Sequence, residues 1–198
     1  MTWKRSRTLP ALANFRFLGC PRDAPSQLRF AARHPERVSH LVLYGGFAVG
    51  INKNPNATTA DRERFAAIKT LMKLGWGGDD PTFRQLFTSA MFSEATKEQI
   101  DAFNELQRLS ASPESAVRYI ETVAEFDVRH LLAQVKAPTL VMHVRDERRV
   151  PVAAGREMAA GIPNARFVAL PGKNHVLLEQ DPGMPIFLEE LRNFLSKE

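Results

Sequence analysis

Acidic and histidine side chains follow two of the apolar segments that predict β-strands. Segment 139–144 runs directly into Asp146 and Glu147, and segment 165–170 is followed by the loop that contains His175. In a parallel sheet the carboxyl ends of the strands lie at one edge, where ligands bind. A carboxylate that orients an imidazole, while the imidazole moves a proton, is the acid–base half of a nucleophile–histidine–acid triad. The spacing therefore predicts part of such a triad at this edge of the sheet.

The elements that would position these side chains form an α/β pattern. The middle two of the four predicted strands are nearly continuous in apolar residues, which is typical of parallel strands buried on both faces. A helix over 152–161 begins after a proline and ends at a glycine, and Asp181-Pro182 predicts an N-cap and first turn for a final helix. This alternation predicts a mainly parallel sheet of about four strands flanked by helices. The predicted strands are 15–18, 38–44, 139–144 and 165–170.

Residues 50–130 have a different character, because they contain helix starts and no convincing strand. Asp80-Pro81 and Ser112-Pro113 each pair an N-cap with a proline at the first helical position, and Thr96 with Gln99 fits a capping box. We therefore expect a helical lobe inserted between the second and third strands.

Composition excludes several classes of protein. Hydrophobic residues make up 44% and charged residues 25% of the 198 residues, as in ordinary globular proteins. No apolar run approaches the roughly 18–20 residues that span a bilayer. No apolar signal-peptide core follows the basic start of the chain, and the single cysteine, Cys20, excludes a disulfide framework and a multi-cysteine zinc site. We expect a cytoplasmic protein with no membrane partner, no metal and no cofactor.

The net charge of +5 is concentrated near the amino terminus, where residues 1–37 hold eight Lys/Arg and two acidic residues. Such asymmetry can indicate a nucleic-acid surface. Apolar residues and prolines interrupt these charges, so no continuous basic helix forms, and a solvated basic surface is the preferred interpretation. A basic nucleic-acid-binding module remains an alternative.

Three stretches of the chain resemble the α/β-hydrolase family. They are Phe-Ala-Ala-Arg-His-Pro-Glu-Arg-Val at 30–38 with Leu-Val-Leu-Tyr-Gly-Gly at 41–46, Asp-Val-Arg-His-Leu-Leu at 127–132, and residues 137–198. The resemblance implies a partial α/β-hydrolase core over 1–49 and 131–198, with a helical cap or lid over 50–130. It also implies hydrolysis of a small acyl or ester substrate by a nucleophile–histidine–acid triad.

Carried over by position, the resemblance gives His175 the role of the catalytic histidine. The spacing to Val150-Pro151 favours Glu147 as the acid, with Asp146 as the alternative. The lobe would shape an acyl pocket, for which Phe83, Phe87, Met91 and Phe92 are candidate lining residues, with core packing as the other interpretation of each.

The nucleophile position departs from the family pattern. The family's Gly-x-Ser-x-Gly turn places its serine where this chain has Pro21, and its second glycine where the chain has Asp23. Proline offers neither a nucleophile nor a backbone N–H. Cys20 stands one residue early and Ser26 several residues late, so neither fits the turn. The resemblance therefore implies an impaired triad.

The resemblance does not include the amino-terminal strands of the family's fold, which precede the nucleophile turn. About 20 residues precede the nucleophile position, whereas one strand–helix–strand unit takes roughly 30 residues. We therefore expect the first strands, and the loop that supplies half of the oxyanion hole, to be absent. A non-catalytic remnant that only folds or associates is thus a second hypothesis. The unpaired edge of strand 15–18 also predicts self-association.

Overall fold

A computed structural model describes residues 15–19 and 23–196 of the chain, and its centre is a four-stranded parallel sheet. The strands follow the chain order, which confirms the predicted sheet, and every neighbouring pair is parallel. The strands are β1 (Phe15–Gly19), β2 (Val38–Tyr44), β3 (Thr139–Val144) and β4 (Arg166–Leu170).

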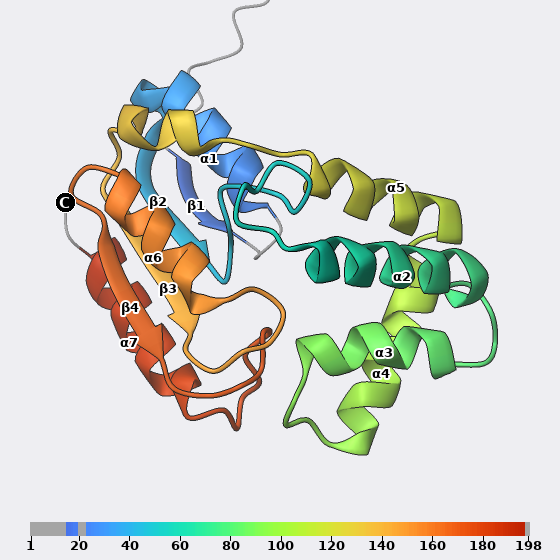
Figure 1. The fold of residues 1–198 in the computed structure, drawn as a ribbon. Helices are drawn as coiled ribbons and strands as arrows, with labels where there is room; N and C mark the ends of the chain where they lie inside the picture. The colour runs from blue at the N-terminus through green and yellow to red at the C-terminus, as the bar shows by residue number, and fades with distance from the viewer. Residues whose placement is uncertain (1–14, 20–22, 197–198) are drawn as a thin grey trace, which may run out of the picture.

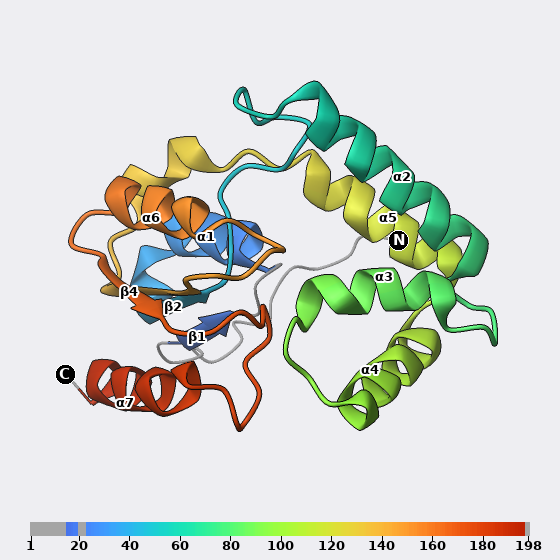
Figure 2. The same ribbon diagram turned by 60° about the horizontal axis from the view of Figure 1, so that its bottom comes forward.

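Helices cover both faces of this sheet (Figures 1 and 2). Helices α1 (Ala24–Arg33) and α6 (Val152–Gly161) lie on one face, together with the short 3₁₀ helix η2 (Arg129–Gln134). Helix α7 (Gly183–Leu195) lies on the other face, and a second short 3₁₀ helix, η1 (Pro35–Arg37), leads into β2. The buried strands therefore need apolar side chains on both sides, as their nearly continuous apolar sequences indicated.

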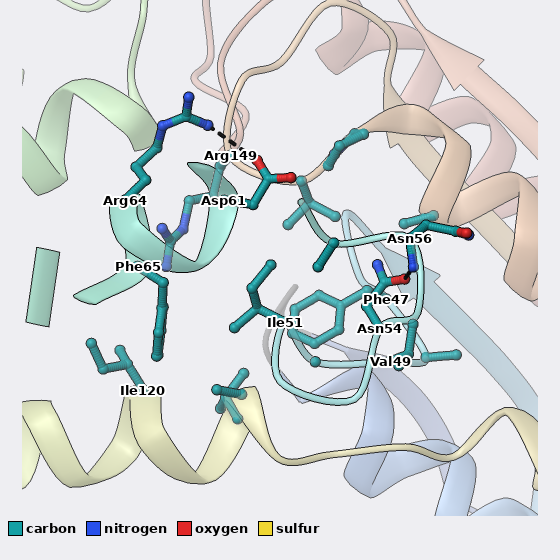
Figure 3. Close-up of a pocket in the computed structure, with 18 of the residues that line it drawn as sticks. Phe47, Val49, Ile51, Asn54, Asn56, Asp61, Arg64, Phe65, Ile120 and Arg149 are labelled. Carbon is teal, nitrogen blue, oxygen red and sulfur yellow. Dashed lines mark hydrogen bonds and ion pairs between the residues drawn. The ribbon is translucent and has the colours of Figure 1, made fainter. Parts of the chain in front are cut away.

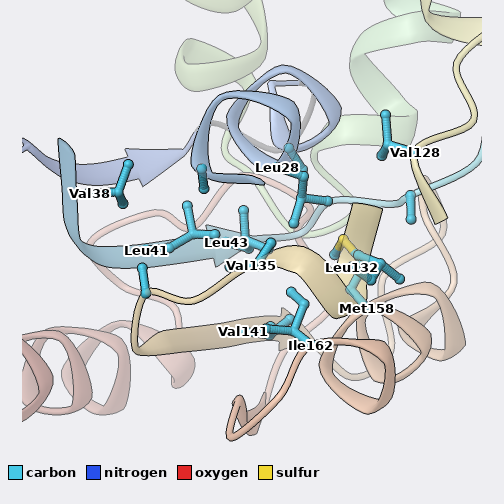
Figure 4. Close-up of a cluster of buried hydrophobic side chains, with 14 residues drawn as sticks. Leu28, Val38, Leu41, Leu43, Val128, Leu132, Val135, Val141, Met158 and Ile162 are labelled. Carbon is cyan, nitrogen blue, oxygen red and sulfur yellow. The ribbon is translucent and has the colours of Figure 1, made fainter. Parts of the chain in front are cut away.

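Alternation along the strands builds two core clusters. In β2, Leu41 and Leu43 pack toward α1 and α6, while Val42 and Tyr44 pack toward α7. Figure 4 shows the larger cluster, in which side chains of the sheet meet Leu28 of α1. The other members of this cluster are Ala24, Ala31, Val38, Ala48, Val128, Leu132, Val135, Ala137, Val141, Met158 and Ile162.

Four helices between β2 and β3 form a lobe beside the sheet (Figure 2). The lobe has a hydrophobic core of its own: Met72, Trp76, Phe87, Met91, Phe92, Ala116 and Ile120. We call these helices the helical lobe; that residues 50–130 form a functional cap stays a prediction. The helices are α2 (Thr59–Gly75), α3 (Thr82–Met91), α4 (Lys97–Ser110) and α5 (Pro113–Ala124).

The helix starts follow the sequence signals, with two differences of one residue. Thr96 and Gln99 form the predicted capping box, and Ser112 caps α5. Helix α3, however, has Pro81 rather than Asp80 as its N-cap, and the N-cap of α7 is Pro182 rather than Asp181. The Asp181 carboxylate is engaged elsewhere, because it accepts hydrogen bonds from the Leu178 N–H and the Asn174 side chain.

Across residues 15–19 and 23–196, no helix has both the length and the apolar character needed to cross a bilayer.

The position of β1 at an edge of the sheet leads to a testable expectation. Within the described residues β1 pairs only with β2, so its other side presents backbone N–H and C=O groups that a further strand could pair with. We expect the isolated chain to self-associate as its concentration rises. Sedimentation velocity over a wide concentration range measures this, and a single monomeric species throughout that range would contradict it.

Candidate active site

A buried carboxylate and a buried imidazole meet where β3 and β4 end. Oε2 of Glu147 lies 2.8 Å from Nδ1 of His175, and the two side chains are only 1% and 2% exposed. The backbone links the two loops, since the Asp146 N–H donates to the carbonyl of Gly172. Gly172 has a φ of +130°, a conformation that glycine adopts without strain.

The structure separates the two candidate acids. Asp146 points into solvent and forms an ion pair with the neighbouring Arg145, with Nε and Oδ2 3.3 Å apart. Within the described residues, the Glu147 carboxylate contacts His175 and the Asp146 carboxylate does not. The arrangement that orients an imidazole is therefore built on Glu147.

The chain turns tightly after Glu147 and encloses its carboxylate. The backbone N–H groups of Arg149 and Val150 both donate to Oε2, at 3.0 Å each. Burial by itself raises the pKa of Glu147. Hydrogen bonds from His143 and His175, the charge of His175 and the Val150 N–H outweigh burial and lower that pKa to about 2. Glu147 is therefore ionised at neutral pH.

The backbone of His175 is held by both the sheet and the helical lobe. The Tyr44 hydroxyl of β2 donates to the carbonyl of His175 at 2.7 Å, and the His175 N–H donates to the carbonyl of Met91, the last residue of α3, at 2.8 Å. The neighbouring Asn174 accepts from the Glu94 N–H at 2.8 Å and donates to Asp181. Hydrogen bonds from the sheet and from the helical lobe therefore hold the loop that contains Asn174 and His175 in place.

A cavity of about 640 Å³ opens beside His175, between the sheet domain and the helical lobe. Phe47, Val49 and Ile51 from the segment after β2 line it together with Phe65 of α2 and Ile120 of α5 (Figure 3). Charged side chains also line it: Asp61, Arg64, Arg148, Arg149 and Glu157. Asp61 and Arg64 pair with each other at 3.4 Å, and apolar groups make up most of the remaining lining.

The described residues supply no evident nucleophile for this pair. Pro21 and Cys20 lie outside the described residues, and Ser26 is an exposed residue of α1 that does not line the cavity. The described lining of the cavity contains no serine, threonine or cysteine. What residues 23–196 present is a hydrogen-bonded carboxylate–imidazole pair whose imidazole lines a cavity with both apolar and charged walls.

The candidate pocket residues Phe83, Phe87, Met91 and Phe92 do not line the main cavity. Phe87, Met91 and Phe92 are buried in the core of the lobe, and the ring of Phe83 packs against Gly75. Core packing was thus the correct interpretation for Phe87, Met91 and Phe92. The lining comes instead from the segment after β2, from α2 and α5, and from residues 148–157 of the loop after β3 and the start of α6.

His143 is a further residue at the site that sequence patterns did not indicate. Its Nε2 lies 2.8 Å from Oε1 of Glu147. The usable signal was its polarity within an otherwise apolar strand, four residues before the acid.

Comparison with known proteins places this arrangement in a family. The sequence profile of the alpha/beta hydrolase fold matches residues 28–182. The 2-hydroxy-6-oxo-6-phenylhexa-2,4-dienoate hydrolase of Burkholderia cepacia is 27% identical over 153 residues, which are 75% of this chain and 51% of that protein. The 2-hydroxy-6-oxononadienedioate/2-hydroxy-6-oxononatrienedioate hydrolase 2 of Pseudomonas putida is 30% identical over 165 residues, covering 78% and 54%.

Solved structures agree on the fold. An esterase from Exiguobacterium antarcticum superposes with a TM-score of 0.78 at 20% identity, over 94% of this chain and 68% of the esterase. The chain belongs to the α/β-hydrolase family. It spans about half the length of the curated relatives that it matches.

The low pKa of Glu147 predicts how stability depends on pH. A carboxyl whose pKa falls from 4.5 in the unfolded chain to about 2 in the folded chain stabilises the fold above pH 4.5. This contribution, about 3 kcal/mol, is lost progressively as the pH falls toward 2. We expect Glu147→Gln to abolish it, so the difference in unfolding free energy between wild type and variant should shrink in acid.

Urea denaturation at a series of pH values measures this difference. Asp146→Asn is the matched control, because Asp146 is the adjacent, exposed carboxylate, and its pH dependence should parallel that of the wild type. Equal pH dependence of the wild type and Glu147→Gln would contradict the assignment.

Proposed function

We propose that this chain carries the acid–base pair and the acyl-binding cavity of a carboxylic-ester hydrolase, and that it is impaired in turnover as it stands. The observation that supports the proposal best is the 2.8 Å hydrogen bond between the buried Glu147 carboxylate and His175, with His175 lining the cavity. Membership of a family of hydrolases gives this pair its chemical context.

The roles of the two residues follow from their hydrogen bond. Glu147 accepts from Nδ1–H of His175, which leaves Nε2 as the nitrogen that takes a proton from a nucleophile and returns it to the leaving group. Because Glu147 stays ionised at neutral pH, it stabilises the imidazolium formed between these two transfers. His175 is the catalytic histidine and Glu147 its orienting acid in this proposal; Asp146 has no part in it.

The lining of the cavity suggests the class of substrate. Apolar side chains from the segment after β2 and from α2 and α5 would receive an acyl chain, and a cavity of about 640 Å³ accommodates a small molecule. The segment 50–130, which contains the helical lobe, is then the cap that closes the cavity over the sheet. The relatives named above are hydrolases of small oxo-acid compounds, which supports a small-molecule substrate here.

Impairment follows from the residue at the nucleophile position. Pro21 provides no hydroxyl or thiol, so the histidine has no side-chain nucleophile at this position to deprotonate and no acyl-enzyme can form there. The proposal therefore treats this chain as a hydrolase-family protein that retains the acid–base pair without its attacking group.

A direct assay tests the impairment. We expect the chain to hydrolyse short p-nitrophenyl esters no faster than buffer does, and to remain unlabelled by a fluorophosphonate probe. His175→Ala should leave the measured rate unchanged. Labelling of a serine, or turnover that disappears in His175→Ala, would overturn the impairment.

The second arm of this experiment tests the acyl cavity and needs no turnover. Titration with methyl hexanoate should shift the imidazole NMR signals of His175 in a saturable manner. Ala90→Trp, which fills the cavity, should abolish the shift, whereas Ala66→Trp on the exposed side of α2 should preserve it. No saturable shift, or equal shifts in both variants, would overturn the assignment of the cavity.

A further inference from the structure

His143 is a buried histidine that contacts the carboxylate of Glu147. It belongs to β3, its side chain is fully buried, and its ring faces α6. Nε2 of His143 lies 2.9 Å from the carbonyl oxygen of Val150 and 2.8 Å from Oε1 of Glu147. The carbonyl oxygen lies in hydrogen-bonding position to Nε2, and the carboxylate oxygen lies beside the same nitrogen. One ring nitrogen thus contacts both ends of the turn that carries the acid.

The two oxygens of Glu147 have unequal surroundings. Oε2 receives three donors, which are the backbone N–H groups of Arg149 and Val150 and Nδ1 of His175. Oε1 has no in-line hydrogen-bond donor among the described residues. The N–H of His143 is the polar group recorded beside Oε1, so this oxygen depends on His143 for its stabilisation.

The packing around His143 selects one tautomer. Nδ1 has no hydrogen-bond partner among the described residues, and it lies against Gly155 of α6, where a Cβ atom would come within 2.7 Å of it. A proton on Nδ1 would be a buried donor without an acceptor, which is costly. The proton therefore belongs on Nε2, between Val150 and Glu147.

We propose that His143 is a positioning residue for the acid–base pair: its Nε2–H holds the Glu147 carboxylate and the Val150 carbonyl in register, so that Oε2 faces His175. Gly155 is part of the same device, because the absence of a side chain there gives the ring its place. His143 is not itself among the residues that line the cavity; it acts through the two groups that it contacts, the Glu147 carboxylate and the Val150 carbonyl.

Loss of His143 has a definite consequence in this account. Without the N–H, Oε1 loses the polar group that lies 2.8 Å from it, so Glu147 binds a proton more readily or turns away from His175. Either change weakens the Nδ1–H···Oε2 hydrogen bond. The catalytic meaning of this device rests on the proposed function, but the hydrogen bond itself can be measured without turnover.

NMR on the intact chain tests the proposal with two readouts. The first is the pKa of Glu147, followed through the chemical shift of its carboxyl carbon, and the second is the downfield signal of the Nδ1 proton of His175. In His143→Phe we expect the pKa of Glu147 to rise by about one unit or more, and the His175 proton signal to broaden or vanish. His143→Gln, whose amide can donate to the same oxygens, should restore both. A folded His143→Phe with both readouts unchanged would overturn the proposal.

Two further variants separate positioning from general packing. His40 is a buried histidine of the neighbouring strand β2, where its ring meets the edge of Phe194 at 5.3 Å, so His40→Phe should leave both readouts unchanged. Gly155→Ala keeps His143 but displaces its ring, and it should shift both readouts in the same direction as His143→Phe. It serves as the test if His143→Phe does not fold. Equal effects of His40→Phe, or no effect of Gly155→Ala, would contradict the assigned role.

The other charged groups around the cavity do not account for differences in the two NMR readouts between variants. They are Arg148 and Arg149 of the acid loop, Glu157 of α6, and Asp61 and Arg64 of α2, and they are identical in every variant. A failed ester-binding experiment would refute the acyl cavity and leave this result standing, so the two proposals can fail separately.

Discussion

The burial of one ionised carboxylate governs the architecture of this site. A charged group removed from water is tolerated only when donors surround it, and Glu147 is almost wholly enclosed. Its donors come from the turn after β3, from the loop after β4 and from β3 itself. The tight turn, the place of His175 and the buried His143 are thus parts of one solution to one electrostatic requirement.

The fold brings these donors together through its topology. Parallel strands β3 and β4 are neighbours, so the loops at their carboxyl ends meet, and a backbone hydrogen bond from Asp146 to Gly172 joins them. The helical lobe completes the arrangement from the other side, because the carbonyl of Met91 accepts the His175 N–H and Arg149 stacks over Phe87 at 5.0 Å. The lobe therefore shapes the cavity and also fixes the histidine that faces it.

Sequence patterns predicted the parts of this structure that depend on local chemistry. The apolar runs of the four strands, the capping box at Thr96 and the carboxylate and histidine after β3 and β4 all depend on residues close together in the chain. The spacing to Val150-Pro151 favoured Glu147 over Asp146 through the family resemblance, but only the folded loop shows which of the two neighbouring side chains faces His175. The cavity lining, the support by His143 and the use of Asp181 within the histidine loop arise from long-range packing, which leaves no periodic signal.

A double-mutant cycle between Glu147→Gln and His175→Ala tests the central claim, that these two residues form one buried, interacting pair. Unfolding free energies of the wild type, both single variants and the double variant give the coupling energy. The account predicts a coupling of more than about 1 kcal/mol, as expected for a hydrogen bond to a charged group. The cycle between Asp146→Asn and His175→Ala should be additive within about 0.5 kcal/mol. Additivity at Glu147 together with coupling at Asp146 would contradict the account.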